Sequence, residues 1–164
     1  MEKEPKELTM GISYNSEDRI AHTILVVPDG RIVAVRGRNS SFMKQWRVSV
    51  NRKVIVDYDG SKPEPIEVAV WSVYTHFGTR LDEKYFELIF LFYITQLDKA
   101  MELFLCKIPS GVALSCSKHL AIRVATFEEI LHDMSKNREE FSLESVHAMN
   151  IASGLEPRGE EKWT

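Results

Sequence analysis

The feature that most constrains this chain is an apolar run of 24 residues from Tyr85 to Ile108. Its length would suit a membrane-spanning helix, but charged side chains interrupt it. These charges are Glu87, Asp98, Lys99, Glu102 and Lys107. Each would be costly in hydrocarbon, so the run is predicted to form the buried centre of a domain. Aromatic residues favour a strand in its first half and helical spacing follows in its second, and we expect one long buried helix with a break near Thr95.

The residues before this run have the pattern of antiparallel strands. Two β-branched runs, residues 20–27 and 31–36, flank a Pro-Asp-Gly turn at residues 28–30, which predicts a hairpin. Further strands are expected at residues 8–14, 45–50, 53–58 and 66–77, with a turn at residues 51–52. The first sixty residues are therefore predicted to form an antiparallel meander.

The residues after the run predict a strand pair and two helices. The strands are expected at residues 112–117 and 120–125. Thr126 followed by Glu129 fits a capping box, which predicts a helix over residues 127–135. Ser142 begins a second predicted helix, and Gly154 is its expected C-terminal stop.

Together these elements predict an α+β fold: an N-terminal antiparallel β meander or small barrel or sandwich, a buried apolar helix in the middle and two C-terminal helices. The length of 164 residues fits a single domain, residues 8–154, between a flexible N-terminus at residues 1–7 and a flexible acidic tail at residues 155–164. The charged opening lacks the apolar region of a secretory signal. We expect an intracellular protein, cytoplasmic or nuclear, without a transmembrane segment.

A basic stretch stands out in a chain of net charge −3. Residues 31–53 contain seven cations and no acid, whereas residues 126–164 contain nine acids and four bases. The basic stretch consists of Arg31, Arg36, Arg38, Lys44, Arg47, Arg52 and Lys53, and Trp46 lies among them. On neighbouring strands these side chains would converge on one sheet surface. Such a surface suits phosphates, with Trp46 stacking on a base or entering a membrane interface.

These features favour a non-enzymatic binding or assembly protein whose basic sheet surface engages RNA, DNA or an anionic membrane. Self-association like that of a small viral matrix or nucleocapsid protein is expected with it. In the plainer interpretation the cations are solvated or pair with the acidic C-terminal helices, and Trp46 belongs to the core. Ser41 follows an Arg-x-Arg-x-x pattern and is a candidate phosphorylation site, where a phosphate would weaken binding of an anionic partner.

Two alternatives stay open. The first is a protein-interaction module whose basic stretch binds an acidic protein partner or the acidic C-terminal region of a second copy. The second is a small metal-dependent hydrolase that uses Asp57 and Asp59, which follow a predicted strand, with Glu64 or Glu67 nearby. The same Asp59 also begins an ordinary Asp-Gly turn.

Signatures of catalysis and of cofactor binding are absent from the sequence. It contains no Gly-x-Ser-x-Gly elbow, no phosphate-binding Gly-rich loop and no His-Glu-x-x-His pair. The two cysteines, Cys106 and Cys116, lie in apolar surroundings without metal-ligand spacing and are expected to be free thiols. We therefore expect neither an enzyme nor a cofactor.

Overall fold

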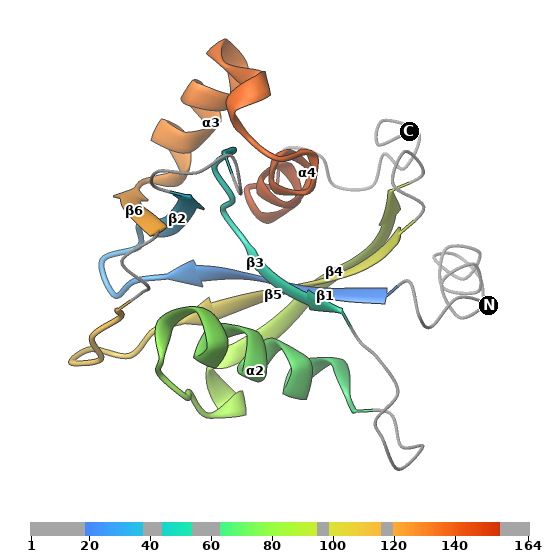
Figure 1. Ribbon diagram of the computed structural model, residues 1–164, viewed down its shortest axis with the longest axis vertical. Helices are drawn as coiled ribbons and strands as arrows, with labels where there is room; N and C mark the ends of the chain where they lie inside the picture. The colour runs from blue at the N-terminus through green and yellow to red at the C-terminus, as the bar shows by residue number, and fades with distance from the viewer. Residues whose placement is uncertain (1–18, 38–43, 54–62, 95–98, 116–119, 155–164) are drawn as a thin grey trace.

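The structure is a computed structural model that describes residues 19–37, 44–53, 63–94, 99–115 and 120–154. These residues form a six-stranded sheet with helices on both faces (Figure 1). The strands are β1 (Arg19–Val26), β2 (Ile32–Gly37), β3 (Val50–Lys53), β4 (Phe86–Ile94), β5 (Lys99–Lys107) and β6 (Leu120–Ala125). The helices are α2 (Pro65–Phe77), α3 (Phe127–Lys136) and α4 (Leu143–Ala152), with short 3-10 helices η2 (Glu83–Tyr85) and η3 (Arg138–Glu140).

Strand β1 is the centre of the sheet. The strand order is β4-β5-β1-β2-β6, and β3 also pairs with β1. β5 is parallel to β1 along its whole length, and the other pairings are antiparallel. On its other side β1 pairs with β3 through its first half and with β2 only between Val26 and Ile32. Strands β2 and β3 therefore share one side of β1.

The two faces of the sheet are covered by different helices. Leu25 of β1 belongs to the same buried cluster as Phe77 of α2. Its neighbour Ile24 points to the opposite face and belongs to a cluster with Ile130 of α3 and Met149 of α4. Figure 1 shows α2 below the sheet and α3 and α4 above it. The result is a three-layer arrangement in which the central strands have no solvent-facing side.

The predicted α+β fold class is confirmed. The chain forms a mostly antiparallel sheet and ends in helices α3 and α4. The predicted strand at residues 8–14 and both terminal segments lie outside the described residues. None of the described helices is long and apolar enough to cross a membrane.

Turn and cap residues gave correct local predictions. The β1–β2 hairpin turns through Gly30, whose φ is 93° and whose N–H donates to the Val27 carbonyl at 2.8 Å. The first turn of α3 is capped by Thr126, whose Oγ1 accepts a hydrogen bond from the Glu129 N–H at 3.0 Å. Helix α4 begins after Ser142, which caps it in the same way. The hairpin and both C-terminal helices are therefore confirmed.

The predicted helix over the apolar run is wrong, because this run forms the antiparallel strands β4 and β5. β5 lies between β4 and β1, and its residues 100–104 are all buried. A strand buried on both faces has no alternation of polar and apolar residues, which removes the usual strand signal. Met101 and Phe104, whose spacing suggested one helix face, belong to the clusters on opposite faces of the sheet.

The predicted strand over residues 66–77 is also wrong, because this segment is helix α2. Its β-branched and aromatic residues favour a strand, but Val73 and Phe77 are one helical turn apart and both are buried against the sheet. Pro65 occupies the first turn, where a missing N–H costs nothing. Gly78, with φ of 72°, ends the helix. Burial of one helix face therefore outweighs strand propensity here.

Two smaller predictions also fail. Residues 51–52, predicted as a turn, lie inside β3 and pair with His22 and Ala21 of β1. Residues 112–115 form no strand, and β6 pairs with β2 instead. Strands β3 and β6 each pair with a strand that is distant in sequence. Local turn signals do not reveal such pairings, and they misled the prediction.

Candidate functional site

The structure describes part of the basic stretch and places its residues on β2, on β3 and on the segments beside them. Arg31 lies in the turn after β1 and Arg36 near the end of β2, and both are exposed. Lys44 and Arg47 lie between β2 and β3, and the backbones of Arg52 and Lys53 belong to β3. Arg38 and the candidate phosphorylation site Ser41 lie outside the described residues. Helices cover both faces of the central strand β1, whereas the Arg36 side chain of β2 is exposed.

Two arginines of the basic stretch have partners within the chain. The Arg31 Nε donates to Asp29 Oδ2 at 2.9 Å. The Arg31 backbone N–H, and then its guanidinium, hold the pKa of Asp29 below its ordinary value. The Arg36 guanidinium carbon lies 4.6 Å from the centroid of the Trp46 ring, a cation–π contact. This contact covers a face of the indole that was expected to stack on a base.

Trp46 and Arg47 join the sheet to the C-terminal helical layer. The Arg47 backbone exchanges two hydrogen bonds with Val35 of β2, at 2.8 and 2.9 Å. The Trp46 N–H donates to the Glu140 carbonyl at 2.8 Å, and the Ser142 N–H donates to the Trp46 carbonyl at 3.1 Å. Trp46 also packs against the cluster that contains α3 and α4. These contacts connect β2 to η3 and to the N-terminal cap of α4.

Buried polar groups gather on the same side of the sheet as α4. His22 Nδ1 lies 2.9 Å from Ser49 Oγ, and His22 is only 2% exposed. Ser145 Oγ accepts hydrogen bonds from the Val48 N–H at 2.9 Å and from the Ser142 hydroxyl at 2.8 Å. Because the serine and histidine of this cluster are shielded from solvent, they cannot meet a substrate in this conformation.

Helix α2 begins next to the carboxylates of the hydrolase alternative. Glu64 and Glu67 are exposed at its N-terminus, where the Glu64 N–H donates to Glu67 Oε1 at 3.2 Å. Asp57 and Asp59 lie outside the described residues, in the segment that links β3 to α2. All four carboxylates fall within residues 57–67 of the sequence. The chain thus places acidic side chains before and at the start of α2.

The described residues do not by themselves make a metal site or a reactive thiol. No three His, Cys, Asp or Glu side chains within the described ranges come together as a metal-binding group. Burial raises the pKa of the Cys106 thiol to about 12, so it is protonated at neutral pH and is neither a nucleophile nor a ready ligand. A metal at the start of α2 would therefore need Asp57 and Asp59.

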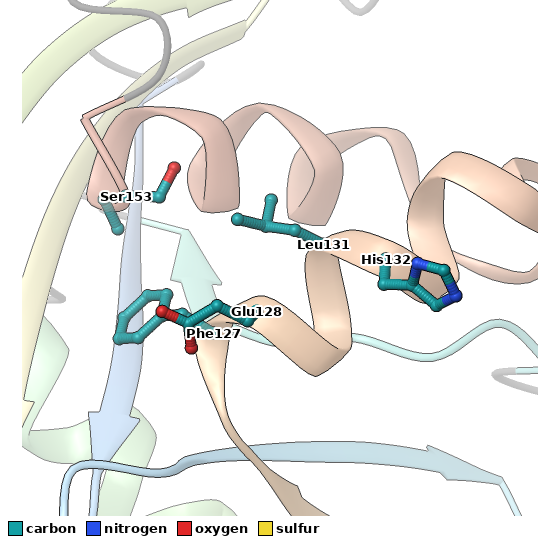
Figure 2. Close-up of a pocket in the computed structure, with 6 residues that line it drawn as sticks. Phe127, Glu128, Leu131, His132 and Ser153 are labelled. Atoms are coloured by element: carbon teal, nitrogen blue, oxygen red, sulfur yellow. The ribbon is translucent and has the colours of Figure 1, made fainter.

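A separate pocket lies between α3 and the C-terminal end of α4 (Figure 2). It is lined by Phe127, Glu128, Leu131, His132, Ala152 and Ser153. Figure 2 shows Leu131 between the two helices, with Phe127 and Glu128 at the beginning of α3 and His132 farther along the same helix. Sequence reasoning missed this pocket, because its walls come from two helices whose contact depends on tertiary packing. Its mostly apolar walls suit binding of an apolar group more than covalent chemistry.

Comparison with known proteins shows similarity in fold and none in sequence. No protein-family model matches the chain, and no curated protein sequence matches it. The DR0079 protein of Deinococcus radiodurans has a similar structure, with a TM-score of 0.55 and 16% identity over 74% of each chain. A MutT/nudix family protein from Enterococcus faecalis has a TM-score of 0.50 at 8% identity, over 65% of this chain and 42% of that protein. This chain therefore spans less than half the length of the Enterococcus faecalis protein.

These similarities overturn two expectations from the sequence. We expected a non-enzymatic protein that binds nucleic acid or an anionic membrane, and we expected no enzyme. The chain instead shares its fold with a MutT/nudix family protein, and the small hydrolase that was kept as an alternative replaces the binding protein as the function to be proposed. The prediction rested on local charge density in the sequence, which bears on possible partners and carries no information about the fold.

Proposed function

We propose that this protein is a small metal-dependent hydrolase in which Asp57 and Asp59 hold a divalent cation. The observation that carries the proposal is the fold similarity to a MutT/nudix family protein. A fold hosts many activities, so the site must be argued from the residues of this chain. The carboxylates at residues 57–67, before and at the start of α2, are the strongest such group.

The chemistry of the donor set fits Mg²⁺ or Mn²⁺. Both are hard cations that prefer carboxylate oxygens, and Mg²⁺ is commonly held by one or two carboxylates together with phosphates of the substrate. When bound, such a metal polarises a phosphoryl oxygen and lowers the pKa of a coordinated water. Asp57 and Asp59 would hold the ion, and Glu64 and Glu67 would add negative charge beside it. Arg52 and Lys53, which precede this segment in β3, are the nearest cations in sequence for a phosphate group.

A thermal-shift experiment with Mg²⁺ tests the metal site directly. A metal at about 100 times its Kd adds ~2.7 kcal/mol to the free energy of unfolding. For a domain of this size that raises the Tm by about 5–11 °C. We expect this shift in the wild type and its loss in Asp57→Asn and Asp59→Asn. Glu87→Gln, which removes an exposed carboxylate from β4, is the matched control and should keep the shift.

Hydrolysis is measured in parallel, with Mg²⁺ or Mn²⁺, as phosphate released from pyrophosphate and as nitrophenol released from bis(p-nitrophenyl) phosphate. Activity that requires the metal and disappears in Asp57→Asn supports the proposal. A wild type that shows neither a metal-dependent Tm shift nor metal-dependent hydrolysis contradicts it. A shift that survives in both aspartate variants contradicts the assignment of the ligands.

A further inference from the structure

Helix α2 presents two large aromatic side chains on its outer side. Trp71 is 48% exposed and Tyr74 is 42% exposed. Their rings meet edge to face with centroids 5.4 Å apart, and the Arg80 guanidinium carbon lies 5.8 Å from the Trp71 centroid. Figure 1 shows α2 as the outer layer on its side of the sheet, and the exposure of both rings means that the described residues leave much of their surface uncovered. Exposed aromatic pairs beside an arginine have the composition typical of association surfaces.

Five exposed residues along α2 and at its two caps have the spacing of a helix–helix seam. The stripe consists of Glu64, Glu67, Trp71, Tyr74 and Gly78, all of them exposed. Their separations alternate between three and four residues, as in a heptad pattern. A helix with this spacing can pack lengthwise against another helix. The opposite side of α2 already packs on the sheet, so the stripe is a second contact side.

The charges of this stripe are arranged for an antiparallel partner identical to itself. Its N-terminal end carries Glu64 and Glu67, and Arg80 follows its C-terminal end. In an antiparallel pair centred between Trp71 and Tyr74, each Trp71 faces the Tyr74 of the other copy. Glu64 of each copy then faces the segment next to Arg80 of the other. A two-fold axis therefore matches aromatic with aromatic and acid with base.

We propose that two copies of this chain associate through the outer stripe of α2 in this antiparallel arrangement. The occupant of the stripe is a second copy, because its charge pattern is self-complementary. The contact is small compared with a standard interface, so the association is weak. It does not depend on the hydrolase proposal, since the test reads oligomeric state and not activity.

Sedimentation velocity of the full chain, from about 5 to about 500 μM, covers the weak range expected of a small interface. We expect a monomer–dimer equilibrium in the wild type. Trp71→Ala should raise the Kd by about tenfold or more, because it removes a central aromatic residue. Arg80→Glu should weaken the dimer similarly, and adding Glu64→Arg to Arg80→Glu should restore it by reversing both charges. Circular dichroism checks that each variant is folded.

Ile122→Ala is the matched control, because Ile122 is a large apolar residue, 38% exposed, on β6 at an edge of the sheet. It should leave the Kd unchanged. A wild type that stays monomeric across the range overturns the proposal. So does a Trp71→Ala variant that associates as tightly as the wild type, or a control that weakens association equally. Failure of the charge-reversed pair to associate overturns the antiparallel arrangement.

Discussion

The two faces of the sheet are covered in different ways. On the α2 side, contact with the sheet is made by apolar residues, such as Val73 and Phe77, that belong to one buried cluster. On the α3/α4 side a second apolar cluster is joined by hydrogen bonds from residues 45–48 to η3, Phe141 and α4. The α2 layer is therefore held chiefly by burial, whereas the α4 layer also depends on polar groups that must keep their partners.

Two buried serines show this difference at one residue each. Ser72 of α2 and Ser145 of α4 are both almost fully buried. Ser145 Oγ accepts two hydrogen bonds, but Ser72 Oγ has no partner among the described residues. A serine hydroxyl thus links α4 to the segment before β3 on one face of the sheet. On the other face a serine hydroxyl is buried without a described partner.

The largest expected effect tests the apolar α2 layer. Phe77→Ala removes a side chain that is 1% exposed and leaves a cavity between α2 and the sheet. We expect a loss of about 3–5 kcal/mol in the free energy of unfolding, measured by urea denaturation. Leu88→Ala, at a position 52% exposed on β4, should cost well under half of that. Equal losses would contradict our description of the α2 cluster as core.

A pH series tests the polar α4 layer. Burial, and then the charge of Arg138, lower the pKa of His147 from 6.5 to about 4. Between these values the unfolded chain binds the proton more readily than the folded one. Stability from this residue is therefore fully present above about pH 6.5 and is lost as the pH falls toward about 4. The loss should be about 1–3 kcal/mol.

Urea denaturation of the wild type and of His147→Gln across this pH range measures that effect. The variant should show a flatter dependence of stability on pH, because it lacks the titrating group. The wild type should lose stability faster than the variant as the medium becomes acidic. Parallel pH profiles for the two proteins would show that His147 does not report on the α4 layer.

The serine pair gives the sharpest matched comparison. Ser145→Ala leaves the buried Val48 N–H without its acceptor and should cost about 1–3 kcal/mol. Ser72→Ala removes a hydroxyl with no described partner and should change stability by less than about 0.5 kcal/mol, or raise it. Both values come from urea denaturation at neutral pH. If the two substitutions cost the same, the contrast between the faces does not hold.

The smallest expected effect concerns the contact between the basic stretch and the α4 layer. Arg36→Ala removes the guanidinium from the Trp46 ring and should cost about 0.5–1 kcal/mol. Lys44→Ala is the control, because Lys44 is exposed and belongs to the same stretch. Urea denaturation measures the free energy of unfolding of both variants. Equal values would show that the Arg36–Trp46 contact does not stabilise this layer.

How much of the fold could be predicted depended on whether the signal was local. Thr126 with Glu129, and the turn at residues 28–30, act within a few residues, and their structures were predicted correctly. The identity of residues 66–77 and 85–108 depended on what would cover them. Strand propensity predicted a strand where α2 forms, and helical spacing predicted a helix where β4 and β5 form. In these segments the burial of one or both sides determines the secondary structure.

The same distinction between local and distant signals applies to the candidate functional residues. Asp57 and Asp59 are visible in the sequence as a carboxylate pair after a predicted strand, and the hydrolase proposal is built on them. The pocket between α3 and α4 and the Arg36–Trp46 contact could not be found, because each joins residues brought together by packing.

By itself the sequence determined the α+β class, the β1–β2 hairpin and the two capped C-terminal helices, because turns and caps are hydrogen-bonded within a few residues. Only the tertiary structure decided that β5 lies beside β1 and that α2 is a helix. The physical reason is that burial is shared between segments distant in the chain. A residue's covered side is set by its partners, which its neighbours in sequence do not reveal.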